Sequence, residues 1–130
     1  MKTKRILILE DDILTLSKIF DALYKIETAM KLDLSVIVLS EYIQVEKYIN
    51  KDLDVSFDLI LLDRDCKLGG SFHVLDFKKF VPNKIVGISS VPDYNQALIK
   101  HGITQSILKE YSKLDQFAIS LEDTIKTIFS

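Results

Sequence analysis

Five short apolar runs punctuate the sequence, and most of them are continuous rather than alternating. A continuous apolar run of this length is typical of a strand that is covered on both faces, as in a parallel sheet with helices on either side. The runs predict strands at 5–10 (RILILE), 34–39 (LSVIVL), 57–62 (FDLILL), 84–89 (KIVGIS) and 103–108 (ITQSIL).

Two segments between and after these runs carry apolar residues at helical spacing, which predicts amphipathic helices that pack on the sheet. The first stripe comprises Leu16, Ile19, Phe20, Leu23, Ile26 and Met30, and the second comprises Leu114, Phe117, Ala118, Leu121, Ile125 and Ile128. The segment after Gly70 gives the weakest helical pattern of the chain.

Helix ends are indicated by residue types that satisfy or stop a first or last turn. Pro92 before and Gly102 after frame a helical segment, because proline suits the first turn and glycine the residue after the last. Ser112, three residues before Asp115, predicts an N-cap, and Glu41 is interpreted as a helix start.

The alternation of strand and helix in five rounds predicts an α/β fold, a five-stranded parallel doubly wound sheet with helices on both faces. In such a sheet, the ligand crevice lies outside the carboxyl ends of the strands, where the strand order reverses. The residues that end each predicted strand are therefore the candidates for chemistry.

Length and charge narrow the class of protein. The 130 residues, 48% of them hydrophobic, suit a single domain over 1–130 with its own core. The 17 basic and 19 acidic residues are mixed along the chain, which argues against direct nucleic-acid binding. The only cysteine cannot form an internal disulfide, and the first apolar run is too short for a signal peptide or a membrane span, so we expect a cytoplasmic protein without membrane contact.

The strand ends carry a consistent set of polar residues. The first ends at Glu10, Asp11 and Asp12, the third at Asp63, the fourth at Ser89 and Ser90, and the fifth at Lys109. These acids, hydroxyls and an ammonium would converge if their strands are neighbours, because parallel strands end at the same edge of a sheet.

Four motifs resemble those of the receiver domain of bacterial two-component response regulators. They are ILILEDD, DLILLD, VGISS and HGITQSILK, which occur in the family's order and span nearly the whole chain. The resemblance implies a stand-alone receiver with the flavodoxin-like strand order 2-1-3-4-5. It also implies a protein that is no enzyme beyond its own phosphorylation and dephosphorylation.

By this resemblance, Asp63 accepts a phosphoryl group from a histidine kinase or a phosphotransfer protein. A carboxylate is a competent nucleophile for that transfer, which depends mainly on positioning and charge neutralisation. Glu10 and Asp11 would hold Mg²⁺ (or Mn²⁺) together with Asp63 and the backbone carbonyl of Asp65, because magnesium takes hard oxygen ligands. Lys109 would pair with the phosphoryl group.

Three serines and a second role of Asp65 complete the predicted site. Ser89 would donate its hydroxyl to a phosphoryl oxygen and couple phosphorylation to movement, while Ser90 is small enough to keep the pocket open. The side chain of Asp65 would face the phosphoryl group, where it would either touch the metal through water or position the hydrolytic water and so set the lifetime of the phosphorylated state. Ser106 stands where the family places a rotating aromatic switch, so we expect intact phosphoacceptor chemistry with an unusual output surface.

Other positions depart from the family as well. Lys67 and Ser71 replace a proline and a glycine of the loop after the phosphoacceptor, while Gly69 and Gly70 come earlier, so this loop should have its own shape. Glu110 replaces a proline that follows the lysine through a cis bond. We expect a trans bond here, because a non-proline cis bond costs about 2.5 to 4 kcal/mol.

Simpler explanations exist for each residue alone. Glu10, Asp11 and Asp12 could be acids that favour a helix start, Asp63 a turn cap, Ser89 a loop hydroxyl and Lys109 a solvated charge. Only the joint placement at strand ends favours a site. Cys66 is interpreted as a neutral structural thiol, and the isolated His73 and His101 receive no metal or phosphate role.

Two other functions stay open. LLDRDCKL also resembles the first motif of haloacid-dehalogenase-type phosphatases, although two strands precede it here and EYSKLDQF lacks a convincing acidic pair. The departures at Lys67, Glu110 and Ser106 also suit a receiver-like binding module that works without phosphorylation.

Without an output domain, a receiver acts by docking to a downstream protein, which the sequence does not name. The surface to test runs from Pro92 through the last strand and the final helix, and a homodimer through this 92–130 face is an option.

Overall fold

The computed structural model describes all 130 residues, and its five parallel strands form one sheet. The order is β2-β1-β3-β4-β5, so the predicted fold class and strand order are confirmed. The strands are β1 (Lys2–Leu9), β2 (Leu32–Leu39), β3 (Leu59–Leu62), β4 (Ile85–Gly87) and β5 (Gln105–Ser106).

The last two strands are shorter than the apolar runs that predicted them, but their backbones stay together beyond their regular parts. The N–H of Ile107 donates to the Gly87 carbonyl at 2.8 Å, and the N–H of Lys109 donates to the Ser89 carbonyl at 3.2 Å. Lys109 is therefore fixed beside the end of β4 by its own main chain.

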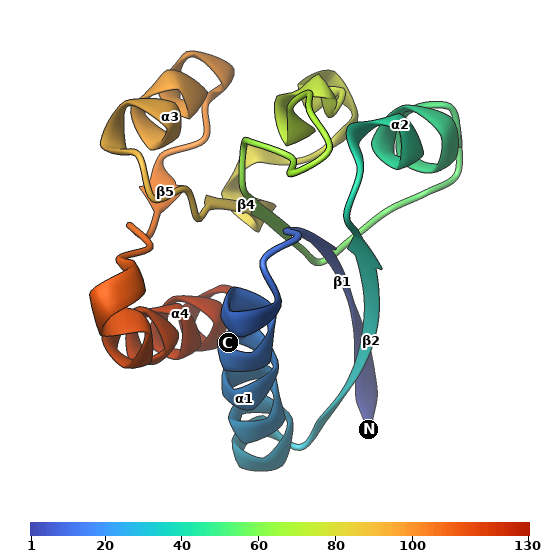
Figure 1. Cartoon of the computed structure of the whole chain (residues 1–130). Helices are drawn as coiled ribbons and strands as arrows, with labels where there is room; N and C mark the ends of the chain where they lie inside the picture. Colours follow the sequence, from blue (N-terminus) through green and yellow to red (C-terminus); the bar gives the residue numbers. More distant parts are fainter.

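Helices cover both faces of the sheet (Figure 1). α1 (Ile13–Met30) and α4 (Leu114–Phe129) lie side by side on one face. The other face carries α2 (Tyr42–Gln44), which continues as a wider turn through Val45–Asn50, and α3 (Pro92–Gln96), which continues as a tighter turn through Ala97–His101.

The sheet residues alternate between two buried clusters, which explains the continuous apolar runs. Ile6, Ile8, Leu59, Leu61, Val86 and Ile88 face α1 and α4. Leu7, Leu9, Ile60, Leu62 and Ile85 face α2 and the segment that contains α3. None of the helices combines the length and the apolar composition that a membrane span requires.

The predicted helix ends are confirmed at three positions and wrong at one. Pro92 opens α3, Gly102 ends its continuation with φ 80°, and Glu41 caps α2 in a reciprocal pair with Gln44. Ser112 is no N-cap, because it lies in a separate turn (Tyr111–Lys113) and α4 begins after Lys113 without a side-chain cap.

The helix considered after Gly70 does not form, and three single turns connect β3 to β4 instead. These turns are Phe72–Val74, Phe77–Lys79 and Pro82–Lys84. Phe72, Leu75 and Phe80 are the buried side chains of these turns, and they anchor the connection to the core. The Lys79 ammonium ties this connection to the segment after α2 by donating to the carbonyls of Ile49, Asn50 and Asp52.

Candidate functional site

A polar pocket of about 260 Å³ lies at the carboxyl ends of β1, β3, β4 and β5. Five carboxylates and two lysines are among its twelve lining residues. The lining is Glu10, Asp11, Asp12, Asp63, Asp65, Cys66, Lys67, Ser89, Ser90, Val91, Lys109 and Tyr111. The structure thus brings together every predicted site residue except Ser106, which lies exposed on β5.

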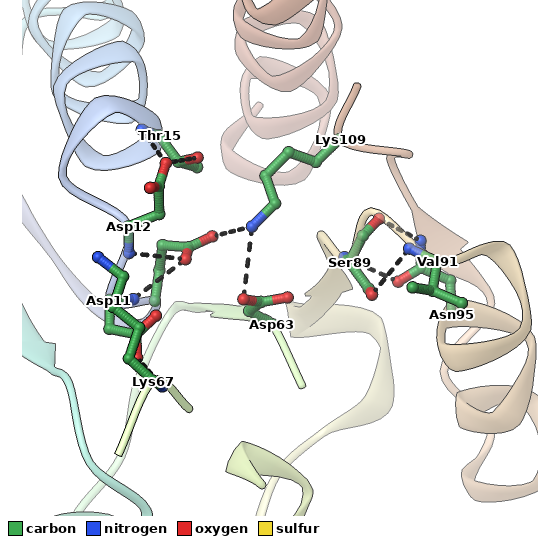
Figure 2. A network of polar contacts seen from close by, with 10 residues as sticks. Asp11, Asp12, Thr15, Asp63, Lys67, Ser89, Val91, Asn95 and Lys109 are labelled. Carbon is green, nitrogen blue, oxygen red and sulfur yellow. Dashed lines mark hydrogen bonds and ion pairs between the residues drawn. The ribbon is translucent and has the colours of Figure 1, made fainter. Parts of the chain in front are cut away.

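Lys109 is the buried centre of this pocket. Its Nζ lies 2.6 Å from Glu10 Oε1, and the lysine and glutamate side chains are each 1% exposed. The same Nζ points to Asp63 Oδ2 at 3.4 Å (Figure 2). Burial lowers the pKa of Lys109, but the charges of Glu10 and Asp63 outweigh this effect, so that the pKa is raised. Lys109 therefore stays charged.

The two carboxylates around Lys109 are hard to ionise. Burial and the neighbouring Asp63 raise the pKa of Glu10 to about 7, although Lys109 and a hydrogen bond from the Asp12 N–H oppose the shift. Burial likewise raises the pKa of Asp63 against the effect of Lys109. A single lysine thus does not fully compensate the two acids, and a further cation in the pocket would relieve their repulsion.

The carboxylates of Glu10, Asp11 and Asp63 have the geometry of a cation site. One oxygen from each lies within 4.8 Å of the others. The backbone carbonyl of Asp65 accepts no hydrogen bond from the chain, so it is available as a further ligand. This set of hard oxygen donors fits Mg²⁺ or Mn²⁺ better than a metal that prefers nitrogen or sulfur.

Lys67 contributes to the site through its backbone. Its N–H donates to Asp11 Oδ2 at 2.6 Å, which orients that carboxylate. A proline at this position, as in the resembled family, has no N–H and could not form this bond. The departure at Lys67 therefore supports the acidic pocket and does not dismantle it.

The loop between Asp63 and β4 is closed by short-range hydrogen bonds. The N–H of Phe72 donates to the Arg64 carbonyl at 2.7 Å, and the N–H of Cys66 donates to the Gly70 carbonyl at 3.1 Å. Gly70 has φ +81°, and a Cβ there would overlap the ring of Tyr42. Gly69, with φ 95°, and Gly70 thus shape a tight loop that presents Asp65 and Lys67 to the pocket.

Asp12 differs from Glu10 and Asp11 in that it caps α1. Its Oδ2 accepts hydrogen bonds from the Thr15 N–H at 2.9 Å and the Thr15 hydroxyl at 2.6 Å. The hydrogen bond from the Thr15 hydroxyl is the main reason why the pKa of Asp12 is lowered. The simpler reading of these acids as helix-start residues therefore holds for Asp12.

Replacing Asp12 by alanine should lower the free energy of unfolding by about 1 kcal/mol, the usual contribution of an N-cap. Urea unfolding followed by circular dichroism measures this loss. Asp12→Asn keeps a capping oxygen and should retain most of the stability. If Asp12→Ala unfolds at the same urea concentration as the wild-type chain, the cap does not contribute as argued.

The predicted serines differ in their surroundings. Ser89 is buried, and its hydroxyl accepts a hydrogen bond from the Val91 N–H at 3.1 Å. Ser90 is exposed at the pocket rim, and the Asp65 side chain is 67% exposed with its Oδ1 3.5 Å from the Arg64 guanidinium. Ser106 offers neither bulk nor proximity for an aromatic-type switch.

Sequence reasoning missed two residues of the site. The ring of Tyr111 lies 5.4 Å from Lys109 Nζ and lines the pocket, which its position two residues after the strand-end lysine could have indicated. The Asn95 amide hydrogen-bonds the backbone of Ser89, and no pattern in the sequence points to this contact.

The peptide bond after Lys109, the Cys66 thiol and the EYSKLDQF segment are as expected from the sequence. The peptide bond between Lys109 and Glu110 is trans, since the chain has no cis bond. Burial raises the pKa of the Cys66 thiol to about 11, which agrees with an unreactive structural cysteine. Asp115 pairs with Lys18 at 2.6 Å, and neither it nor Glu110 lines the pocket, so EYSKLDQF supplies no phosphatase-type acids there.

Solved structures that resemble the chain share its architecture over nearly its full length. The phosphorylated cyanobacterial phytochrome response regulator RcpA is 21% identical, with a TM-score of 0.73 over 98% of this chain and 95% of that one. The chain has the receiver-domain fold. The Mn²⁺-bound response regulator Rcp1 is 18% identical, with a TM-score of 0.71 over 97% of this chain and 94% of that one.

A third receiver structure agrees with these two. The bacteriophytochrome response regulator RtBRR is 24% identical, with a TM-score of 0.64 over 95% of this chain and 78% of that one. No protein-family model matches the sequence, and no curated protein matches it in sequence. The receiver fold is therefore evident from structure.

Proposed function

We propose that the chain is a phosphoacceptor receiver in two-component signal transduction. The buried Lys109 between Glu10 and Asp63 is the observation that carries this proposal. A buried ion cluster is often neutral or unfavourable for stability compared with apolar residues, so its place at the carboxyl edge of the sheet favours a role in chemistry. The receiver fold of RcpA, which is described as phosphorylated, supports the same reading.

In the proposed reaction, an Asp63 carboxylate oxygen forms a bond to phosphorus while the bond from phosphorus to the donor breaks. The donor is a phosphohistidine of a kinase or phosphotransfer protein, which leaves as the free imidazole. Lys109 then lies beside the acylphosphate and neutralises part of its charge, and the Ser89 hydroxyl donates to a phosphoryl oxygen. Water later attacks phosphorus, the bond from phosphorus to the Asp63 oxygen breaks, and inorganic phosphate leaves the regenerated carboxylate.

A divalent cation, Mg²⁺ by preference, would be held by Glu10, Asp11, Asp63 and the Asp65 carbonyl. When bound, it supplies neutralisation of charge on the transferring phosphoryl group. The chain catalyses only its own phosphorylation and dephosphorylation in this proposal. It signals by docking to a downstream protein.

The test is the intact mass of the protein after incubation with acetyl phosphate and Mg²⁺. We expect a labile adduct of one phosphoryl group, which chelator and the Asp63→Asn substitution both abolish. Free phosphate is followed in parallel. Sustained phosphate release from varied phosphomonoesters without an adduct would favour a phosphatase, and neither signal from a folded sample would favour a phosphorylation-independent binding module.

Replacing Asp65 by alanine should change the lifetime of the adduct more than its rate of formation. The Asp65 side chain lines the pocket, is 67% exposed and pairs with Arg64, so in this proposal it lies where water would reach the phosphoryl group. Adduct formation and decay are measured by timed mass spectra after donor removal. Equal changes in the two rates would contradict this role. Asp65→Asn is the control, because it removes the charge and keeps the size of the side chain.

A further inference from the structure

The backbone of Ser89 is clamped by a buried side chain of α3. Asn95 Oδ1 accepts a hydrogen bond from the Ser89 N–H at 3.1 Å, and Asn95 Nδ2 donates to the Ser89 carbonyl at 3.2 Å (Figure 2). Asn95 is only 7% exposed, so water does not readily replace these bonds. A movement of the Ser89 main chain must therefore move Asn95 or break both bonds.

A third bond joins Ser89 to the start of α3. The Ser89 hydroxyl accepts from the N–H of Val91, the residue that precedes the first turn of the helix. If this hydroxyl turns to a phosphoryl group on Asp63, it leaves the Val91 N–H without its partner. Phosphorylation would thereby remove a hydrogen bond at the start of α3 and strain the two bonds between Asn95 and the Ser89 backbone.

α3 also packs directly on the main chain of β4. A Cβ at Gly87 would lie 2.8 Å from Asn95 Oδ1 and 2.8 Å from Leu98 Cδ1, closer than normal contacts allow. The Arg64 guanidinium lies over the ring of Tyr94, 3.9 Å from its centroid, and Arg64 directly follows Asp63. The helix is therefore in contact with the ends of both β3 and β4.

We infer that the Asn95 amide carries the phosphorylation-dependent movement of Ser89 to α3, in place of an aromatic side chain on β5. The exposed Ser106 leaves that strand without such a side chain. The surface that changes is then α3 with Ala97–His101. This inference rests on the proposed phosphorylation of Asp63.

The test compares hydrogen–deuterium exchange of residues 91–101 with and without Mg²⁺ and beryllofluoride, a mimic of the phosphoryl group. In the wild-type chain, exchange at the start of α3 should become severalfold faster. In Asn95→Ala, this response should be lost while acetyl phosphate still forms the adduct. Asn50→Ala is the matched control, because Asn50 also bridges two backbone groups, Val74 O and Asp76 N, away from the site.

Gly87→Ala provides a second variant that keeps the amide and displaces it, and it should also lose the response. The inference is overturned if either Asn95→Ala or Gly87→Ala responds as the wild-type chain does, or if Asn95→Ala forms no adduct while Asn50→Ala does. If the wild-type chain forms the adduct but hydrogen exchange in α3 does not change, this inference is overturned while the proposed function stands. Absence of any wild-type adduct instead overturns the proposed function and this inference with it.

Discussion

Replacing Lys109 by methionine is expected to lower the free energy of unfolding by about 3–5 kcal/mol at about pH 8. Methionine fills a similar volume but leaves Glu10 and Asp63 buried together without their shared cation. Because the Glu10 side chain is 1% exposed and the Asp63 side chain is 12% exposed, water can replace little of the interaction with the ammonium. Urea unfolding of the metal-free protein measures the loss.

The destabilisation caused by Lys109→Met should depend on pH, because Glu10 and Asp63 titrate. The pKa of Glu10 is about 7 in the folded chain, against 4.5 as its ordinary value, and the pKa of Asp63 is raised as well. A folded-state pKa above the unfolded value gives stability that is lost as pH rises through the folded pKa. Removing Lys109 raises both pKa values further, so the destabilisation should be smaller at about pH 6 than at about pH 8.

Lys126→Met is the matched control for this prediction. Lys126 pairs with Glu122 at 2.7 Å, one helical turn away, with the lysine side chain 37% exposed. The same chemical change there should cost about 0.5 kcal/mol or less, as for other exposed helix pairs. Equal losses for the two variants would show that Lys109 is not the structural centre of the pocket.

The fold could be predicted because its main signals are local. The apolar runs in β1, β3 and β4 are buried on both faces, and each predicted strand forms. Pro92 and Gly102 bound a helix because each acts through its own backbone, whatever the surroundings. The strand order followed from the resemblance to receivers, since no run indicates its neighbours by itself.

The connection between β3 and β4 could not be predicted because its support comes from distant residues. The Lys79 ammonium binds carbonyls at positions 49, 50 and 52, which lie far away in sequence. The N-cap prediction for Ser112 was wrong because this residue lies in a separate turn, Tyr111–Lys113. Asp115 is engaged by Lys18 of α1, and the helix starts without a capping side chain.

The sequence predicted which residues form the candidate site, but not which of them pair with one another. Strand ends placed Glu10, Asp63 and Lys109 at one edge, and the structure brings them into contact. That Lys109 binds Glu10 more closely than Asp63 depends on side-chain packing, which the sequence does not encode locally. The same holds for Asn95, an ordinary helix residue until its packing against Ser89 is seen.

If the pocket binds Mg²⁺ as proposed, the affinity is expected to weaken about tenfold between about pH 8 and pH 6. Since the pKa of Glu10 is about 7, this carboxyl is mostly ionised at the higher pH and mostly protonated at the lower one. A protonated carboxyl contributes no negative charge to the cation site, so Mg²⁺ must displace the proton to bind. Calorimetric titration at the two pH values measures both affinities, and we expect release of about one proton per ion at the lower pH.

The Glu10→Gln and Asp12→Asn variants separate this effect from general changes of charge. Glu10→Gln removes the titrating group, so its Mg²⁺ affinity should be weaker and nearly independent of pH in this range. Asp12→Asn should keep the pH dependence, because the Asp12 carboxylate is engaged by Thr15. An affinity in the wild-type chain that is equal at both pH values would contradict the argument. It would mean that Asp11 and Asp63 hold the ion without Glu10, which would then serve only to anchor Lys109.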